Sequence, residues 1–415
     1  MNDLRNYAAV TGAYWGFTLT DGALRMLVLL HFHRLGFSPL DLAFLFLLYE
    51  AMGALTNFIG GWIGSRHGLK ITLFSGLGVQ IFALLMLSAV NPDWMLLASV
   101  VYVMLAQALS GIAKDLTKMS SKSAVKLVVA DEDQGLLFKW VAILTGSKNA
   151  LKGLGFLMGG VLLQVLGFDW ALWSMAGGLV IILVLTAAVV RTDLGKAKQK
   201  ITKRDLFSKT REINFLSAAR IFLFASRDVW FVVGVPVFLY SQFGWSFDEV
   251  GALMAAWVIG YGIVQAAVPR FLKNTNDAQS GAQAAKLWGI VLAVVSFAIA
   301  LGVSPEIAAK LGGDSTAATV LVGGLFIFGI VFAVNSSVHS YLIVAYSDHD
   351  KVALNVGFYY MANAIGRLGG TLLSGLVFQF FGLAACLFVS AALVVLAVIL
   401  TWPLGKDTVL TNQPA

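Results

Sequence analysis

Two lysines, Lys148 and Lys152, lie near the middle of an apolar run from Leu136 to Leu166. The run is long enough to cross a membrane, which takes about 20 apolar residues. A lysine at that depth costs roughly 3 kcal/mol even on the lenient insertion scale. Because the two lysines are four positions apart, they lie on one face of a helix and repel each other. The pair therefore favours binding of a negative group, from the protein or from an anionic ligand.

Further charged residues fall inside other long apolar runs. They are Asp21, Arg25, Glu50, Arg227, Asp228 and Arg367. Together with the lysines they make five cations and three acids, so pairing leaves a surplus of about two positive charges. Arginine's planar fork suits phosphate, carboxylate and the similar arsenate group. We therefore expect a substrate with two or more negative charges, bound by Arg25, Lys148, Asn149, Lys152, Arg227 and Arg367. The alternatives are an ion-pair network that only holds two halves together and, for Asn149, a bond between helices.

The acids are expected to act as counter-ions or in coupling. Asp21 and Arg25 are four positions apart and can pair within one helix. Glu50 is either a carboxylate that carries a proton, because burial favours its neutral form, or a counter-ion of Lys148 or Lys152.

Asp228 directly follows Arg227, and neighbours in a helix do not face each other. We therefore expect Asp228 to pair with a residue on another helix. Arg220 lies on the same face as Arg227, two turns away. It either joins the site or extends to the membrane interface.

The composition defines the elements that must hold these residues. The chain has 415 residues, of which 59% are hydrophobic and 12% charged, and its mean hydropathy is +0.83. Soluble domains carry about 25% charged residues. The sequence therefore predicts an all-α protein with several membrane spans. One cysteine, Cys386, excludes a disulfide framework and a thiolate metal site within the chain. No catalytic constellation, metal cluster or phosphate-binding loop is visible, so we expect no enzyme and no cofactor.

Twelve apolar runs predict twelve transmembrane helices in two sets of six. They are Tyr7–Phe32, Leu42–Gly64, Ile71–Val90, Trp94–Ala113, Leu136–Leu166, Trp170–Val190, Phe215–Phe243, Val250–Pro269, Lys286–Val303, Ala318–Tyr346, Val352–Phe381 and Leu383–Trp402. The predicted domains are an N-terminal half at 1–190, a basic central loop at 191–213 and a C-terminal half at 214–415.

The basic residues predict the orientation. Most lie in the connections on one side and in the central loop, whereas the other side offers only Arg34 and Lys310. The positive-inside rule then places both termini and the central loop in the cytoplasm. The net charge of +7 is explained by this bias and by contact of the central loop with anionic lipid, not by nucleic-acid binding.

An internal repeat relates the two halves. Ser38 and Asp41 open one helix with a capping box, and Ser246 and Glu249 open another in the same way. The stretch NALKGLGFLMGG also resembles NAIGRLGGTLLSG, which places Lys152 opposite Arg367. A parallel repeat of two six-helix halves is the arrangement of the major facilitators, in which two such halves surround a polar cavity. This repeat predicts one cationic wall in each half.

The loop GWIGSRHGLK resembles the signature of the major facilitator superfamily between its second and third helices. Gly61, Arg66, Gly68 and Lys70 match it and are expected to form a gating loop. Ser65 replaces the acid of the signature, which removes the charge pairing that this loop makes in the family.

Six longer stretches resemble the ArsJ branch of the major facilitators, the organoarsenical efflux permeases. They are TLTDGALRMLVLLHFH, SGIAKDLTKMSSKSAVKL, LTGSKNALKG, RIFLFASRDVWFVV, WVIGYGIVQ and GRLGGTLLSG. The resemblance implies export of 1-arseno-3-phosphoglycerate, which a partner glyceraldehyde-3-phosphate dehydrogenase makes from arsenate, and hence arsenate resistance. It implies a permease of the bacterial inner membrane, which we expect to be a monomer. It brings no residue roles.

Two other functions are compatible with the residues. A carrier of ordinary organophosphates, exchanging phosphoglycerate for phosphate, would need the same cations. A non-transporting sensor or a membrane-bound enzyme is disfavoured, because the sequence has neither a signalling domain nor a catalytic cluster.

Overall fold

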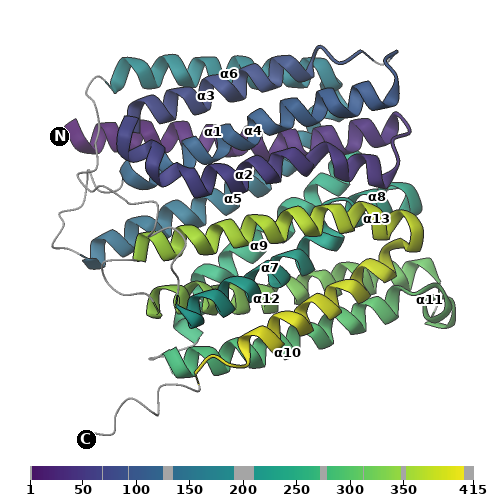
Figure 1. The fold of residues 1–415 in the computed structure, drawn as a ribbon. Coiled ribbons are helices and arrows are strands. Elements are labelled where there is room, and N and C mark those ends of the chain that lie inside the picture. The colour runs from purple at the N-terminus through teal and green to yellow at the C-terminus, as the bar shows by residue number, and fades with distance from the viewer. Residues whose placement is uncertain are drawn as a thin grey trace, which may run out of the picture. The chain divides into compact units, whose positions relative to one another are not determined.

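The computed structural model describes residues 2–67, 69–91, 93–124, 134–190, 210–271, 278–311, 313–346 and 352–405. Within these ranges the regular secondary structure is entirely α-helical, as predicted from the apolar runs (Figure 1). Helices satisfy their own backbone groups, which is the main requirement for crossing a bilayer.

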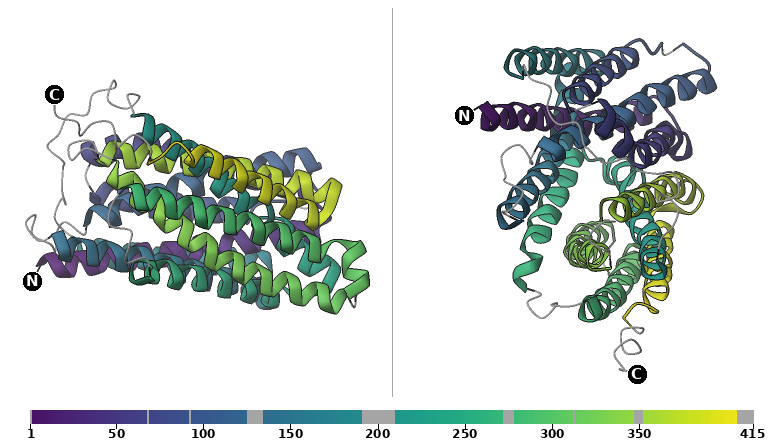
Figure 2. Two further views of the ribbon diagram at one scale, coloured as in Figure 1. Left: turned by 90° about the horizontal axis from the view of Figure 1, so that it is seen from below. Right: turned by 60° about the vertical axis from the view of Figure 1, so that its left-hand side comes forward.

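The helices follow the predicted runs closely. They are α1 (Asn2–Arg34), α2 (Pro39–His67), α3 (Leu69–Leu87), α4 (Leu96–Ala124), α5 (Gln134–Leu166), α6 (Phe168–Val189), α7 (Arg211–Phe231), α8 (Gly234–Phe243), α9 (Phe247–Phe271), α10 (Ala278–Val303), α11 (Pro305–Leu311), α12 (Asp314–Ala345) and α13 (Val352–Thr401). Within each unit defined below, the long helices lie side by side (Figure 2).

The described residues contain ten segments long and apolar enough to cross a membrane. One of them, Asn355–Thr401, holds two helices, because Gly382 has a positive φ of 76° that interrupts the helix inside α13. α1 falls short of the same apolar threshold because it carries Asp21 and Arg25. Another segment, Arg211–Phe243, consists of α7 and its continuation α8. The described helices therefore match the twelve predicted spans.

The chain forms two compact units. Unit 1 comprises Met1–Phe37, Phe44–Ile201 and Trp245–Ile259, and unit 2 comprises Ser38–Ala43, Thr202–Gly244 and Gly260–Ala415. The predicted domain boundaries fall at the ends of the central loop, whose residues 191–209 lie outside the described ranges. Those boundaries stay a prediction.

The first predicted capping box is complete, and the second is formed in part. The Ser38 backbone N–H donates to Asp41 Oδ2 at 3.1 Å, and the Asp41 N–H donates to Ser38 Oγ at 3.2 Å. The Ser246 N–H donates to Glu249 Oε2 at 2.8 Å. Gly36 and Gly244 precede the two serines by two residues, and both have a positive φ, which glycine adopts without strain. This shared geometry confirms the local sequence repeat.

Close backbone contacts fix one helix pair in each unit. In unit 1, a methyl group on Gly155 or Gly159 of α5 would overlap a carbonyl oxygen of α1. In unit 2, a methyl group on Gly366 of α13 would overlap the carbonyl oxygen of Ile221 on α7, and one on Gly370 would reach the backbone of Ala225. Small residues of this kind let membrane helices approach closely. These two pairs carry most of the charged residues of interest.

Four helices present large apolar side chains on their surfaces. Phe82 on α3, Val184 on α6, Val294 on α10 and Ile399 in the second part of α13 are all exposed. Cys386 lies on the same part of α13, but its side chain is buried. The exposed apolar residues suit contact with lipid, while the cysteine itself faces inward.

Candidate functional site

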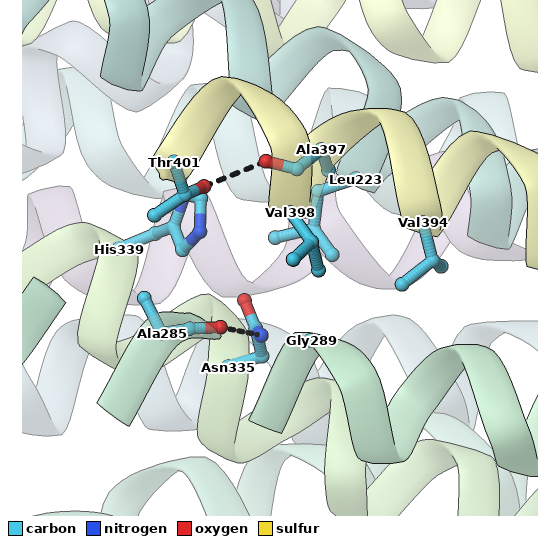
Figure 3. A pocket seen from close by; sticks show the side chains of 9 residues that line it. All are labelled: Leu223, Ala285, Gly289, Asn335, His339, Val394, Ala397, Val398 and Thr401. Atoms are coloured by element: carbon cyan, nitrogen blue, oxygen red, sulfur yellow. Dashed lines mark hydrogen bonds between the residues drawn. The ribbon is translucent and has the colours of Figure 1, made fainter. Parts of the chain in front are cut away.

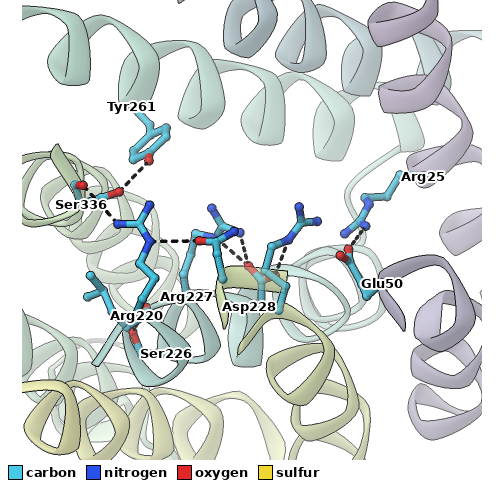
Figure 4. Close-up of polar contacts among 11 residues, drawn as sticks. Arg25, Glu50, Arg220, Ser226, Arg227, Asp228, Tyr261 and Ser336 are labelled. Carbon is cyan, nitrogen blue, oxygen red and sulfur yellow. Dashed lines mark hydrogen bonds and ion pairs between the residues drawn. The ribbon is translucent and has the colours of Figure 1, made fainter. Parts of the chain in front are cut away.

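In unit 1, Arg25 on α1 forms a short ion pair with Glu50 on α2. The Arg25 Nη2 to Glu50 Oε1 distance is 2.6 Å, and the two residues are 5% and 1% exposed (Figure 4). The guanidinium also lies over the rings of Phe46 and Tyr49, at 5.3 and 5.2 Å from their centres. Charge, hydrogen bond and ring contacts together hold this arginine away from water.

Asp21 pairs with a tyrosine and not with Arg25. The Tyr49 hydroxyl donates to Asp21 Oδ1 at 2.6 Å, and both residues are buried. The predicted pair of Asp21 with Arg25 within α1 is therefore wrong. The long arginine side chain reaches across to α2, where Glu50 is fully desolvated and gains more from a charged partner. The structure thus gives Glu50 the partner Arg25, and a contact of Glu50 with Lys148 or Lys152 stays a prediction.

Three charged residues of α4, Lys114, Asp115 and Lys118, lie beyond the predicted span Trp94–Ala113. Lys114 and Lys118 were assigned to a loop, whereas α4 extends to Ala124 and carries both lysines into unit 1. Lys118 Nζ is 3.0 Å from Asp115 Oδ1 and donates to Asn57 Oδ1 at 2.7 Å. Lys114 Nζ lies 4.1 Å from the centre of the Tyr49 ring.

Asp115 is the most enclosed member of this α4 group. It is 0% exposed, and its Oδ2 has no hydrogen-bond partner among the described residues. The sequence signal for the group was the Lys-Asp-x-x-Lys spacing, which places an acid and a base on one helix face and supports pairing across one turn.

Lys148 and Lys152 on α5 are half-buried, as is Asn149. Each of the three interacts with the protein around it. Lys152 Nζ lies 5.7 Å from the centre of the Phe156 ring. One turn before Lys152, the Trp15 indole N–H on α1 donates to Ser147 Oγ at 3.0 Å, which fixes the register of α1 against α5. The predicted lysine face therefore lies on the helix that is packed most closely against α1.

In unit 2, Asp228 on α7 is shared by two arginines. The Arg227 Nε donates to Asp228 Oδ1 at 2.6 Å, and the Arg367 Nε lies 3.3 Å from Asp228 Oδ2 (Figure 4). The expected partner on another helix is present as Arg367 on α13. The expectation that Arg227 would not reach its neighbour is wrong, because its long side chain folds back along α7 onto the carboxylate.

Arg220 has only neutral partners. Its Nε donates to Asn363 Oδ1 and its Nη1 to the Ser336 carbonyl oxygen, both at 3.1 Å. Its guanidinium carbon lies 4.0 Å from the centre of the Phe224 ring and 4.8 Å from that of Tyr359. Arg220 is 4% exposed, so it does not extend to the membrane interface.

A small hollow lies among α7, α10, α12 and the second part of α13 (Figure 3). Its lining is largely apolar, with three polar side chains, Asn335, His339 and Thr401. Asn335 Nδ2 donates to the Ala285 carbonyl oxygen at 2.9 Å. Because the residues that line the hollow include no cationic side chain, it does not suit an anionic substrate.

The predicted gating loop is only partly described. Gly68 lies outside the described residues, and the side chain of Arg66 and the surroundings of Gly61 lie outside them as well. Lys70 begins α3, with its Nζ 5.8 Å from the centre of the Phe74 ring. Across the described ranges, no group of three or more His, Cys, Asp or Glu residues is placed to hold a metal ion.

Membrane-spanning helices that carry buried charges on inward faces define a membrane permease. The family model for the Major Facilitator Superfamily matches residues 8–235. That match covers more than half of the chain, and the chain belongs to this superfamily.

Solved structures support the fold over nearly the full length. The chain is similar to a mutant of the nucleoside transporter NupG, with a TM-score of 0.72, 16% identity and coverage of 97% of this chain and 99% of that one. It is similar to a bacterial homologue of the iron transporter ferroportin in the inward-facing state, with a TM-score of 0.68, 16% identity and coverage of 96% and 98%.

A POT family transporter in complex with a thioalcohol-conjugated peptide gives a TM-score of 0.74 at 13% identity, with coverage of 96% and 95%. Comparison with curated protein sequences finds no match. At these identities the likeness concerns the fold, and the substrate has to be argued from the charged residues.

Proposed function

We propose that this permease exports 1-arseno-3-phosphoglycerate by alternating access and so confers arsenate resistance. The observation that carries the proposal is the excess of buried cations, above all the two arginines that share the single carboxylate of Asp228. Both guanidinium groups lie against this one carboxylate, and an oxyanion that replaces it at either arginine gains a charge-assisted contact. The stretches that resemble the organoarsenical efflux permeases supply the arsenical part of the proposal.

The chemistry of that substrate fits the residues present. It carries a phosphate at one end and an arsenate ester at the other, and both are tetrahedral oxyanions that arginine binds through two parallel hydrogen bonds. A pentavalent arsenical of this kind needs no thiolate ligand. Cys386, the one cysteine of the chain, is buried on the peripheral part of α13.

The proposed binding residues are Arg25, Lys148, Asn149, Lys152, Arg227 and Arg367. When no substrate is bound, Glu50 pairs with Arg25, and Asp228 pairs with Arg227 and Arg367. Asp21, proposed as a further counter-ion, accepts from the Tyr49 hydroxyl. In unit 1, a substrate oxyanion competes with Glu50 for Arg25, and the released carboxylate, still enclosed by protein, takes up a proton. This linkage couples substrate binding to protonation of Glu50, so that substrate and proton occupy the site together.

The proposed setting is the bacterial inner membrane, with both termini in the cytoplasm and the protein acting as a monomer. The residues Gly61, Arg66, Gly68 and Lys70 form the gating loop in this proposal. A glyceraldehyde-3-phosphate dehydrogenase supplies the substrate in the cytoplasm and has no necessary contact with the permease.

A second candidate function is the exchange of ordinary organophosphates, such as phosphoglycerate for phosphate. It is favoured by the same arginines, because phosphate and arsenate share shape and charge. The two functions differ in whether arsenic moves across the membrane.

The deciding experiment uses everted membrane vesicles that contain the permease. They are supplied with glyceraldehyde-3-phosphate dehydrogenase, its substrate, its nicotinamide cofactor and arsenate, and arsenic inside the vesicles is measured. We expect rapid accumulation that requires both the active dehydrogenase and the permease.

Arsenic uptake that is equally fast with inactivated dehydrogenase contradicts the proposal. In parallel, uptake of labelled 3-phosphoglycerate into vesicles loaded with phosphate is measured. Fast exchange there, without dehydrogenase-dependent arsenic uptake, selects the second function.

A further inference from the structure

Arg220 differs from Arg25, Arg227 and Arg367 in the partners that it has. Arg25 contacts Glu50, and Arg227 and Arg367 contact Asp228, so each has a carboxylate. The hydrogen-bond acceptors of Arg220 are the Asn363 side-chain amide and the Ser336 backbone carbonyl, which are both neutral. A guanidinium held in a desolvated place by neutral acceptors keeps its full positive charge and attracts an anion.

The guanidinium of Arg220 also has donors to spare. A guanidinium offers five N–H donors, and the structure gives Arg220 two hydrogen bonds, one from Nε and one from Nη1. Among the described residues Nη2 therefore has no acceptor. The rings of Phe224 and Tyr359 cover the guanidinium from its sides and hold it in place.

The position of Arg220 matches the proposed substrate in length. Arg220 and Arg227 follow one another along α7, with their head groups on the same side of the helix (Figure 4). Two turns of helix separate them, which is about 10 Å along the axis. On α13, Asn363 accepts from Arg220, and Arg367 shares Asp228 with Arg227. These two α13 residues are one turn apart, which is about 6 Å along the axis. An anion with charged groups at both ends of a three-carbon chain spans a distance of this order.

We propose that Arg220 and Asn363 form a second oxyanion-binding position, so that unit 2 binds both charged ends of one substrate. Arg227 and Arg367 bind one end, and Arg220 binds the other through its free Nη2 donor. Asn363 fixes the guanidinium plane by accepting from Nε. This inference rests on the proposed function for its substrate class, an organic anion with two oxyanion ends, and adds a residue that the sequence reading left open.

The experiment compares two three-carbon probes that differ at one end. 3-Phosphoglycerate carries a phosphate and a carboxylate, whereas glycerol 3-phosphate has a neutral hydroxymethyl group in place of the carboxylate. Their affinities for the purified full-length permease in lipid nanodiscs are measured by calorimetry. We expect the wild-type protein to prefer 3-phosphoglycerate by roughly tenfold or more, the effect of one charge-assisted hydrogen-bonded contact.

In Arg220→Met the preference should disappear, while the affinity for glycerol 3-phosphate stays within about twofold of wild type, because that probe needs only one position. Arg211→Met, which removes an exposed arginine of the same helix, is the matched control and should keep the preference. Arg220→Lys keeps the charge without the fork and should keep the fold, with a reduced preference. Its thermal midpoint without ligand shows whether the helix contacts survive.

Three outcomes overturn the inference. The first is an equal loss of affinity for both probes in Arg220→Lys. The second is an unchanged preference for 3-phosphoglycerate in Arg220→Met. The third is that the wild-type protein binds neither probe. The vesicle assay separates this inference from the proposed function. If Arg220→Met takes up arsenic at the wild-type rate with active dehydrogenase, the second oxyanion-binding position is contradicted and the proposed function stands. If the preference for 3-phosphoglycerate depends on Arg220 but no arsenic is taken up, the arsenical substrate is contradicted and the second position stands.

Discussion

The two units balance their buried charges in different ways. In unit 1, Arg25 pairs with Glu50 at 2.6 Å, and Asp21 accepts from the Tyr49 hydroxyl. In unit 2, one carboxylate, Asp228, serves two arginines. In unit 1, the buried Arg25 has the carboxylate of Glu50 to itself among the ion pairs described above. In unit 2, Arg227 and Arg367 share the carboxylate of Asp228. The difference teaches that a count of charges along the sequence does not locate the anion site, because it is the partners that decide where positive charge remains.

The geometry of the pairs supports this contrast. The Arg25–Glu50 pair is almost fully buried, whereas the Arg367 side chain is 17% exposed and lies 3.3 Å from Asp228. A longer, more accessible contact is easier for a substrate oxyanion to replace. We therefore expect unit 2 to provide affinity and unit 1 to provide the exchange that couples transport to protonation.

The strongest test of the contrast removes the shared carboxylate. Asp228→Asn leaves two arginines in a desolvated place with a neutral partner. We expect loss of transport and a decrease of about 3–5 kcal/mol in the free energy of unfolding, the usual effect of breaking a buried pair. Thermal unfolding in detergent and vesicle uptake measure the two effects. The exposed Asp169 supplies the control Asp169→Asn, and equal behaviour of both variants contradicts the assignment.

The next test neutralises one cation in each unit. Lys152→Gln and Arg367→Gln should each lower the initial rate of vesicle uptake by roughly 100-fold, because each removes a charge-assisted contact to the anion. Both proteins should still insert into the membrane, as judged by immunoblotting of washed vesicles. Lys310→Gln and Arg211→Gln are exposed controls. Wild-type rates in both site variants would leave the charges with a structural role only.

A third test concerns coupling. Glu50→Gln keeps a hydrogen-bond acceptor for Arg25 and removes the group that takes up a proton. We expect uptake that no longer responds to an imposed pH gradient, with substrate binding within about threefold of wild type. Uptake at several external pH values is compared with that of Glu306→Gln, an exposed control. If Glu50→Gln keeps the wild-type pH dependence, Glu50 is not the coupling residue. Asp115 is then the next carboxylate to test.

The smallest expected effect comes from Tyr49→Phe. This change removes the hydroxyl that donates to Asp21 and keeps the ring beside Arg25 and Lys114. A buried carboxylate without its donor destabilises the protein by about 1–3 kcal/mol. Thermal unfolding should show a modest shift, with transport reduced far less than in Asp228→Asn. A shift as large as that of Asp228→Asn would show that unit 1 is as sensitive as unit 2.

The fold was predictable because membrane helices are recognisable by their length and apolar content. The repeat was predictable because a glycine followed by a capping serine appears twice, at Gly36 and Gly244. The charged ends of helices were harder to predict from the sequence. Lys114 and Lys118 resembled a loop because a helix that leaves the apolar region looks polar in sequence, although its inward face remains packed.

The pairing of charges was the least predictable part. Spacing along one helix suggested Asp21 with Arg25, yet the arginine pairs with Glu50 on α2. Long arginine side chains choose among all acceptors within several ångströms, and the register between helices decides which of these are near. The same reason explains why Arg227 reaches its own neighbour and why the neutral environment of Arg220 was not foreseen.

The glycine contacts of α1 with α5 and of α7 with α13 have a mechanical consequence. Helices whose backbones are in contact cannot slide or rotate past each other without steric overlap. Each pair is therefore expected to move as one rigid unit. The lysines of α5 travel with α1, and Arg367 travels with Asp228. The spacing of the charged residues within each pair is therefore fixed by the backbone contacts. Hinging has to take place in helices that are joined by softer side-chain contacts.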